Sequence, residues 1–286
     1  MKYTGLLGLI ILLSAPLHAA PQEKKYSLSL SDPSQPVYLD VEMHNGSIHI
    51  IGYEGKTVEI TALLSPLTEA QVKERKKHHH NGPKVMDLDK PKRSMEGLKP
   101  VKNVALNLEI EEQNNRVEIE SERGSYNVTL VVQIPQSAQV EVDLHDGDFA
   151  KLENISGAIE VQTWRGNIEF INIHGPVVAE THGHDIIASF ASFDESSPSS
   201  FTTFSGDIDV TLSRNVAMKL NLRNYQGEIL SGLESEFTPV DSVDKDNRRD
   251  KQKIVLGAQL STQINGGNQA LTLNSYSGDM YLRKTE

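Results

Sequence analysis

The chain has 286 residues, 37% of them apolar, and its 39 acidic and 28 basic residues give a formal net charge of −11. This acidity argues against a nucleic-acid partner, because binding to phosphates depends on Lys and Arg. The sequence contains no cysteine, which excludes disulfides, thiol chemistry and a lipid anchor on cysteine.

The first 19 residues are typical of an export signal. Lys2 carries the positive charge, residues 6–13 form a short apolar core, and Ala19 and Ala20 supply small residues for cleavage. This run is too short to span a hydrocarbon layer of about 30 Å, and no later run approaches the ~18 apolar residues that a membrane helix needs. We therefore expect a periplasmic or secreted bacterial protein without a transmembrane anchor, with residues 20–286 forming one domain.

Short strands with alternating apolar residues precede the central part of the chain. Residues 26–64 read as paired strands that form the N-terminal end of the fold, with a capping role. Residues 104–110 and 126–135 predict further strands, and Asn114-Asn115 predicts a turn between them.

A basic insert interrupts these strands. Residues 69–103 contain ten Lys or Arg against five Asp or Glu, together with His78, His79 and His80. Their composition predicts a flexible loop that carries positive charge on an acidic protein. Nearby Lys and Arg repel cations, so we expect a solvated loop here, with weak metal capture by the three histidines as the alternative.

One short phrase that opens with a glycine recurs through the rest of the chain. Its copies open at Gly46, Gly147, Gly157, Gly166, Gly175, Gly183, Gly206, Gly227 and Gly278. The side chain two residues later is apolar in every copy except the one with Asp185, and most copies repeat an apolar residue two positions further on. Alternation with a period of two is the pattern of a half-buried strand, and the glycine permits the turn before it.

The spacing of the phrases predicts how the strands assemble. Copies between Gly147 and Gly175 are 9 or 10 residues apart, so two copies would make one turn of roughly 20 residues. A strand this short cannot bury its apolar side alone and needs copies stacked above and below it. We therefore predict an all-β, single-domain β-solenoid, with an antiparallel β-sandwich as the alternative. At His184-Asp185 the pattern slips by one residue, which a β-bulge would absorb.

The end of the chain contains a second insert and a last pair of strands. Residues 234–253 are polar and highly charged, as in a surface loop. Gly266-Gly267 then predicts a turn into strands that end at Leu282.

These motifs resemble the putative-adhesin domain family of bacterial envelope proteins. The resemblance rests on Ser205-Gly206-Asp207-Ile208 and Ser277-Gly278-Asp279-Met280, with Asn45-Gly46-Ser47-Ile48 as an earlier copy. It covers roughly residues 37–282 apart from the two inserts. It implies a β-solenoid of stacked short strands and an adhesin-like role, and it implies no catalytic residues or cofactor.

Several residues are candidates for metal binding. His174, His182 and His184, with His145 upstream, recur at predicted turns, and with Asp185 they would form a metal or acid–base cluster if the turns stack them. Asp148, Asp207 and Asp279 follow glycines, but the Gly-Gly-x-Gly-x-Asp unit of calcium-binding repeats is absent. We expect exposed turn histidines, aspartates bonded to their own turn, and no bound metal.

A polysaccharide-active enzyme is the catalytic alternative. Such enzymes use paired carboxylates, and the candidates on outward positions are Glu160, Glu169, Asp209 and Glu228. Trp164 and Arg165 at one turn would stack on a sugar ring, although a single aromatic at a solenoid corner more often packs on its neighbours. Alternating glutamates are usually the solvent side of a strand, and the sequence contains no nucleophile-elbow, Walker or His-Glu-x-x-His motif.

The sequence therefore predicts an exported, non-catalytic envelope protein that presents an extended β surface for adhesion, binding or scaffolding. A polysaccharide or protein of the cell surface is the expected partner, and the basic insert would favour an anionic one. A polysaccharide-active enzyme and a periplasmic metal-binding protein are the alternatives. A strand edge at either end would also permit pairing with a second copy.

Overall fold

The structure is a computed structural model that describes residues 22–67, 108–121, 126–190, 192, 197–240, 244–246, 251–253 and 258–285. The predicted export signal and the whole of the basic insert with His78, His79 and His80 lie outside the described residues. Every helix or strand in the described ranges is a β-strand, and none of these ranges contains a helix long and apolar enough to cross a bilayer.

The strands differ in length, since most contain ten residues or fewer and three contain 15 or 16. They are β1 (Gln22–Ser29), β2 (Tyr38–Tyr53), β3 (Thr57–Pro66), β4 (Leu108–Gln113), β5 (Arg116–Ser121), β6 (Tyr126–Pro135), β7 (Gln139–Glu153), β8 (Ile159–Ile173), β9 (Val177–Thr181), β10 (Ile186–Phe190), β11 (Ser199–Thr203), β12 (Ile208–Leu212), β13 (Met218–Asn224), β14 (Ile229–Ser231), β15 (Thr238–Pro239), β16 (Asp244–Asp246), β17 (Lys251–Lys253), β18 (Ala258–Ile264), β19 (Ala270–Ser275) and β20 (Met280–Lys284).

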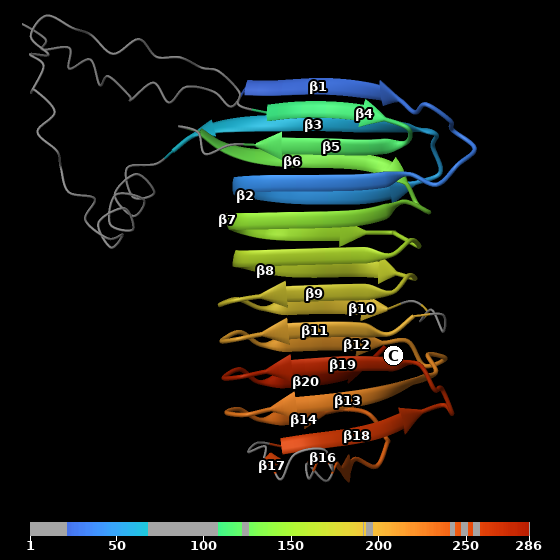
Figure 1. The fold of residues 1–286 in the computed structure, drawn as a ribbon, viewed down its shortest axis with the longest axis vertical. Helices are drawn as coiled ribbons and strands as arrows, with labels where there is room; N and C mark the ends of the chain where they lie inside the picture. The colour runs from blue at the N-terminus through green and yellow to red at the C-terminus, as the bar shows by residue number, and fades with distance from the viewer. Residues whose placement is uncertain are drawn as a thin grey trace, which may run out of the picture.

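These strands stack as the rungs of a β-solenoid, which confirms the predicted fold (Figure 1). Each rung has two parallel walls that face each other across the core; β9, β11, β19 and β13 belong to the first wall and β10, β12, β20 and β14 to the second. Strands β2, β7 and β8 bend through the corner and contribute to both walls. Val140 pairs with Ile159 and Ile159 with Val177, so these rungs contain 19 and 18 residues, close to the predicted 20.

The alternation seen in the sequence becomes alternation of burial. In β9 every second residue is buried and the others are exposed, and the same holds for the first half of β8. The inward side chains stack in columns along the solenoid; in the second wall one column contains Ile168, Ile186, Ile208 and Met280, all fully buried. Each rung therefore completes the core of its neighbours, which is why a single phrase could not fold alone.

The recurring glycines occupy two opposite corners of the solenoid. One corner, called here the ring corner, comprises residues 44–47, 145–148, 164–167, 182–185, 204–207, 225–228 and 276–279. Gly166 there has φ +123°, a conformation that other residues rarely adopt. A Cβ on Gly206 would lie 1.9 Å from the carbonyl oxygen of His184, so rungs meet too closely for a side chain. Gly157 and Gly175 lie at the opposite corner, which explains the half-turn spacing of the phrases.

The apolar pattern is displaced by one residue at His184-Asp185 because His184, and not Gly183, occupies the glycine position of this rung. Ile186 pairs directly with both Ile168 and Ile208, without a register shift at this point. His184 therefore stands where the next rung has Gly206, and the prediction of a β-bulge at these residues is wrong.

The order of the rungs in space differs from their order in the chain (Figure 1). β2 lies between β5 and β6 on one side and β7 on the other. At the other end, β19 and β20 lie between β11 and β12 on one side and β13 and β14 on the other. The prediction that residues 26–64 form the N-terminal end is therefore correct only for β1 and β3, because β2 is an internal rung.

Antiparallel strands cover both ends of the parallel stack. β3 pairs with β6 and with β1, and β4 pairs with β5 at one end; β18 pairs with β13 and β15 at the other. The predicted turns are present: Asn114 and Asn115 join β4 to β5 with φ of 53° and 62°, and Gly266 lies in the turn from β18 to β19. Within the second insert, the described residues include β15, β16 and β17.

Candidate binding surface: a ladder of stacked rings

The ring corner carries an aromatic or imidazole ring in each of seven successive rungs. Every ring lies two residues before the glycine position of its rung, where β2, β7, β8 or the first-wall strand of the rung reaches the corner. In spatial order the rings are His44, His145, Trp164, His182, Phe204, Tyr276 and Tyr225. We call this set the ring ladder.

The rings stack face to face along the solenoid axis. Centroids of neighbouring rings are 5.3 Å apart for His44 and His145, and 6.5 Å apart for His145 and Trp164. The stack is tightest in the middle, where Trp164 and His182 lie 4.3 Å apart with planes inclined by only 3°. Phe204 continues it at 5.2 Å from His182. The parallel rungs impose this arrangement, because equivalent positions of neighbouring strands lie directly beside each other.

The far end of the ladder combines rings that lie far apart in the sequence, because β19 and β20 are placed between earlier rungs. Phe204 and Tyr276 are 72 positions apart in the chain, yet their rings stack at 4.8 Å with planes inclined by 3°. Tyr225 follows at 5.7 Å from Tyr276 and is tilted by 32°. The ladder is continuous only because the rung of β19 and β20 lies between its neighbours.

The larger rings of the ladder are exposed to solvent. Trp164 is 56% exposed, Phe204 50%, Tyr225 47% and Tyr276 43%. Both faces of Trp164, Phe204 and Tyr276 have neighbouring rings, so their exposed parts are chiefly ring edges; Tyr225, the last ring of the ladder, stacks on Tyr276 alone. Large apolar groups that line up on a surface usually mark a place of contact with another molecule.

Buried polar side chains directly before the rings hold the corner in shape. The hydroxyl of Thr203 donates to the carbonyl of His184 at 3.1 Å and accepts from the N–H of Gly206 at 3.0 Å. The hydroxyl of Ser275 instead bonds within its own rung, donating to the carbonyl of Gly278 at 3.2 Å and accepting from the N–H of Gly278 at 2.9 Å. These residues are nearly inaccessible to solvent, and they fix the turn that directs each ring outward.

A column of carboxylates lies beside the ladder and links four successive rungs. Oδ1 of Asp185 accepts from the backbone N–H of Asp207 at 2.9 Å, and Oδ1 of Asp207 accepts from Asp279 at 2.8 Å. Asp279 in turn accepts from Glu228 at 2.8 Å. The sequence predicted bonds within the same turn, whereas these aspartates bind the backbone of the neighbouring rung.

The surroundings of the ladder are acidic. Within three residues of a ring, the chain has nine carboxylates and two arginines. The carboxylates are Glu42, Asp143, Asp146, Asp148, Glu180, Asp185, Asp207, Glu228 and Asp279, and the arginines are Arg165 and Arg223. One arginine is already engaged, since Arg165 lies 3.7 Å from a carboxylate oxygen of Asp146. The ladder thus combines exposed apolar rings with a surplus of negative charge.

The histidines singled out in the sequence do not gather at one place. His145 and His182 are members of the ladder, separated by Trp164. His184 is exposed at the glycine position of its rung, where the chain bends instead of staying extended. His174 lies at the opposite corner, at the other end of β9, with its Nδ1 2.8 Å from the hydroxyl of Ser192. Across the described part of the chain, no three His, Asp or Glu side chains form a group that could hold a metal ion.

The four carboxylates proposed for catalysis are also dispersed. Glu160 is on the first wall, Glu228 is at the ring corner, and Glu169 and Asp209 are on the second wall with Ile187 between them. Asp209 is held by Arg283, whose Nε and Nη2 lie 2.8–2.9 Å from its oxygens.

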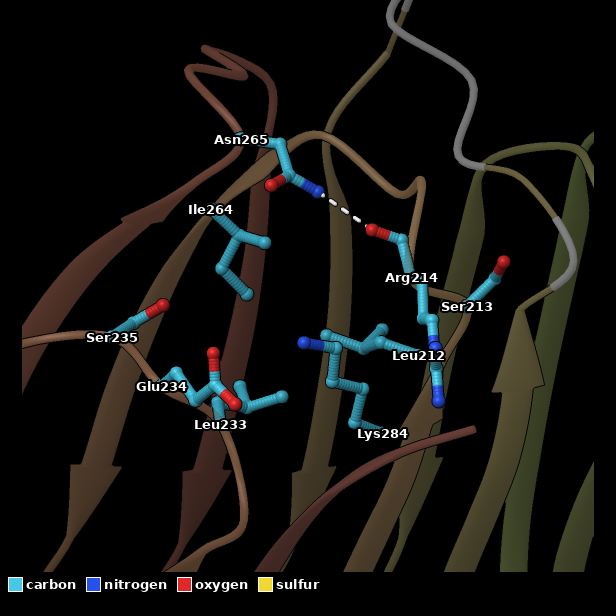
Figure 2. A pocket seen from close by; sticks show the side chains of 9 residues that line it. All are labelled: Leu212, Ser213, Arg214, Leu233, Glu234, Ser235, Ile264, Asn265 and Lys284. Atoms are coloured by element: carbon cyan, nitrogen blue, oxygen red, sulfur yellow. Dashed lines mark hydrogen bonds between the residues drawn. The ribbon is translucent and has the colours of Figure 1, made fainter. Parts of the chain in front are cut away.

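Two depressions in the surface are candidates for an enclosed site. A pocket of about 170 Å³ at the opposite corner is lined by residues that include Leu212, Glu234 and Lys284, and Asn265 Nδ2 donates to the Arg214 carbonyl beside it at 2.9 Å (Figure 2). This volume is smaller than the ~300–1,000 Å³ usual for ligand pockets.

The second depression, of about 300 Å³, lies on the first wall. It contains Glu141 and Glu160, which are paired neighbours in the sheet, together with Tyr38. The hydroxyl of Tyr38 donates to Glu141, and this bond raises the pKa of Tyr38. Arg116 lies 4.3 Å from the centre of the Tyr38 ring and forms a salt bridge with Asp40. Because Glu141 is held by Tyr38 in the first wall, this depression offers one unengaged carboxylate at most, and the ladder is the stronger candidate for a binding site.

Comparisons with known proteins identify a structural likeness but no family. No model of a known protein family matches the chain, and no curated protein does. Among solved structures, a crystal structure described as a "putative cell adhesion protein" from Clostridium sporogenes is similar, with a TM-score of 0.42 and 12% identity, over 93% of this chain and 100% of that one. At this level the likeness carries no conclusion about the role of individual residues.

Sequence reasoning missed the ladder as a whole. In the sequence Trp164 looks like a single aromatic at a corner, but in the structure it is the third of seven stacked rings. The signal was present two residues before each glycine position, where the sequence has His, Trp, Phe or Tyr in every ring-corner copy.

Proposed function

We propose that this chain is an exported, adhesin-type binding protein that contacts an extended partner of the cell envelope or cell surface through the ring ladder. The observation that carries this proposal is the continuous line of exposed rings at one corner of the solenoid. Trp164, Phe204, Tyr276 and Tyr225 all belong to it, and each exposes more than two fifths of its surface.

The shape of the ladder favours a long partner. Seven rungs spaced by about 4.8 Å give a stripe of roughly 29 Å. A small ligand would use only part of such a stripe, whereas a polymer could contact every rung in the same way. Solenoids commonly bind partners along extended surfaces built from equivalent positions.

Stacking between rungs does not by itself explain why the ladder contains large rings that are exposed to solvent. Stacked rings stabilise neighbouring rungs, each pair by about 0.5–1.5 kcal/mol. The nearby buried column of Thr203 and Ser275 already fixes the corner through backbone hydrogen bonds. Rings as large as Trp164 and Phe204 add apolar surface that stays in contact with water, a cost that burial against a partner would remove.

Retention on polysaccharide films tests the proposal. Films of chitosan, chitin, cellulose and alginate are compared for the wild-type protein, the double variant Phe204→Ala/Tyr276→Ala and the control Ile187→Ala/Leu230→Ala. The control removes two exposed apolar side chains from the second wall. We expect at least one film to retain wild type and control, with retention of the ladder variant weaker by roughly tenfold. Equal retention of both variants, or no retention by any film, would overturn the proposal.

A further inference from the structure

We infer that the ligand of the ring ladder is a cationic glycan, a linear polysaccharide that carries protonated amino groups. This inference rests on the proposed function and adds the chemical class of the partner. It follows from the charge beside the ladder, from the way the rings stack, and from the step at which the surface repeats.

The charge beside the ladder selects against anionic ligands. The nine carboxylates and two arginines near the rings give a local excess of seven negative charges when the histidines are neutral. Glu42 and Asp143 are paired neighbours in the first wall, Glu180 follows after the uncharged Gln162, and all three carboxylates are exposed two residues before a ring. An anionic polymer would meet repulsion along this stripe, whereas a polymer with amino groups would gain from it.

The stacking determines where the cation would be placed. A cation binds an aromatic ring over its face, within about 6 Å of the centroid. In the middle of the ladder those faces are covered, since Trp164 has His182 at 4.3 Å and Phe204 has Tyr276 at 4.8 Å. The amino groups must therefore pair with the flanking carboxylates, while the apolar C–H groups of the ligand contact the ring edges. Amino groups and apolar C–H groups must therefore alternate along the length of the ligand.

The repeat of the surface favours a glycan over a peptide. The rings recur at each rung, a step of about 4.8 Å, and every rung of the ladder except that of Trp164 has a carboxylate within three residues of its ring. In an extended peptide, side chains on one face are two residues apart, roughly 6.7 Å, so basic side chains would lose register with the rungs after two or three steps. One pyranose unit of a linear glycan is about as long as one rung step, and it offers a C–H surface and an amino group in each unit. Neighbouring units of a β-1,4-linked chain are turned over, so a hexosamine polymer can present an amino group to the same side of the ladder at every second rung.

Calorimetric titration of the full mature chain with three hexamers tests this inference. The ligands are a β-1,4-linked hexamer of glucosamine, its fully N-acetylated counterpart and hexalysine, at a pH below the pKa of the glucosamine amines. The two sugars differ in charge and acetylation while sharing the same backbone. We expect the glucosamine hexamer to bind at least roughly tenfold more tightly than either of the others.

Variants that lack carboxylates test whether the negative charge beside the ladder contributes to binding of the glucosamine hexamer. The variant Asp143→Asn/Glu180→Gln removes two carboxylates beside the ladder. The control Glu234→Gln/Glu236→Gln removes two exposed carboxylates outside the ring corner and changes the net charge by the same amount. We expect the first variant to bind the glucosamine hexamer roughly three- to tenfold more weakly and the control to bind like wild type.

Three results would overturn the inference. Equal binding of the acetylated hexamer would mean that a neutral glycan is the ligand, and tighter binding of hexalysine would mean a basic peptide. If films retain the protein through Phe204 and Tyr276 but neither sugar hexamer binds, the ladder remains the binding surface and the assigned ligand class is wrong. Failure of the film experiment would instead remove the proposed function itself.

Discussion

Phe201 and Phe204 lie three residues apart in one rung, but their side chains have opposite surroundings. Phe201 is fully buried and stacks on Phe170 at 5.7 Å and on Phe190 at 6.1 Å. Phe204 is half exposed in the ring ladder. The two residues separate the part of the rung that holds the fold together from the part that we assign to binding.

Replacing each phenylalanine with alanine should therefore have very different effects on stability. We expect Phe201→Ala to lower the free energy of unfolding by about 3–5 kcal/mol, because it leaves a cavity in the core. Phe204→Ala should cost less, about 1–3 kcal/mol, because it removes two exposed stacked pairs, with His182 and with Tyr276. Urea denaturation measures both. A similar, large cost for the two variants would show that the ladder is chiefly a structural element.

Gly206 tests how closely the rungs approach at the ring corner. A Cβ there would lie 1.9 Å from the His184 carbonyl oxygen, whereas a Cβ on Gly183 would meet its nearest neighbour, Ser205 Oγ, at 3.6 Å. We expect Gly206→Ala to destabilise the protein by at least about 1–3 kcal/mol and Gly183→Ala to be tolerated. Thermal unfolding of the two variants provides the comparison, and equal melting temperatures would contradict the close approach.

The Lys151–Glu153 pair predicts a pH dependence of stability. Lys151 Nζ lies 2.7 Å from Glu153, and this bond holds the pKa of Glu153 below its ordinary value of 4.5 although burial acts to raise it. A carboxyl with a lowered pKa stabilises the fold above its unfolded-state pKa and loses this contribution as the pH falls through its folded-state pKa. Lys151→Met should cost about 0.5–1 kcal/mol at neutral pH and little once Glu153 is protonated.

Urea denaturation between neutral pH and about pH 3 measures that difference, with the exposed Lys219→Met as the matched control. A cost of Lys151→Met that does not change with pH would show that the side chain stabilises by packing and not by its charge.

Among the elements, the rung of β19 and β20 differs most in position between the sequence and the stack. It is the last rung in the chain, yet it pairs with β11 and β12 on one side and with β13 and β14 on the other. The chain must therefore leave space for it, or open again, before the rung can be inserted. Its ring, Tyr276, also joins Phe204 to Tyr225 in the ladder.

Removal of residues 268–286 should consequently disturb the interior of the stack. We expect the backbone amides of β13 and β14 to lose hydrogen-exchange protection by more than about tenfold, because both strands lose their parallel partner. Removal of the exposed edge strand β1 is the control and should affect mainly β3, with which it pairs. Protection of β13 that survives the C-terminal deletion would contradict the observed order of rungs.

The period of the fold could be predicted from the sequence, but the order of its rungs could not. Alternation after each glycine is local, so it is visible in single copies such as Gly206 to Val210. The position of the Gly278 copy depends on pairing with residues more than 50 positions away, and the glycine phrases are too alike to specify it. The ladder is hard to predict because its rings come from four residue types and precede the glycines, whereas the regular apolar alternation follows them.

At the scale of the whole molecule, the solenoid converts a short repeated phrase into one long surface. Each rung contributes one ring, its flanking polar groups and one step of about 4.8 Å. Carboxylates lie within three residues of every ring except Trp164, and their surplus over the two arginines makes the stripe negative. A binding surface of this kind has no single essential residue, and its affinity should depend on how many rungs the partner spans.

The most direct test of this account uses the only tryptophan of the chain, Trp164, at the third position of the ladder. Its fluorescence is measured during titration with the glucosamine hexamer, and again in the variant Trp164→Phe/Ile187→Trp, which moves the reporter to the second wall. We predict a saturable change in emission for Trp164 and none for the tryptophan at position 187. A saturable change only at position 187 would place the bound glycan on the other side of the solenoid and contradict the assignment of the ladder as the binding surface.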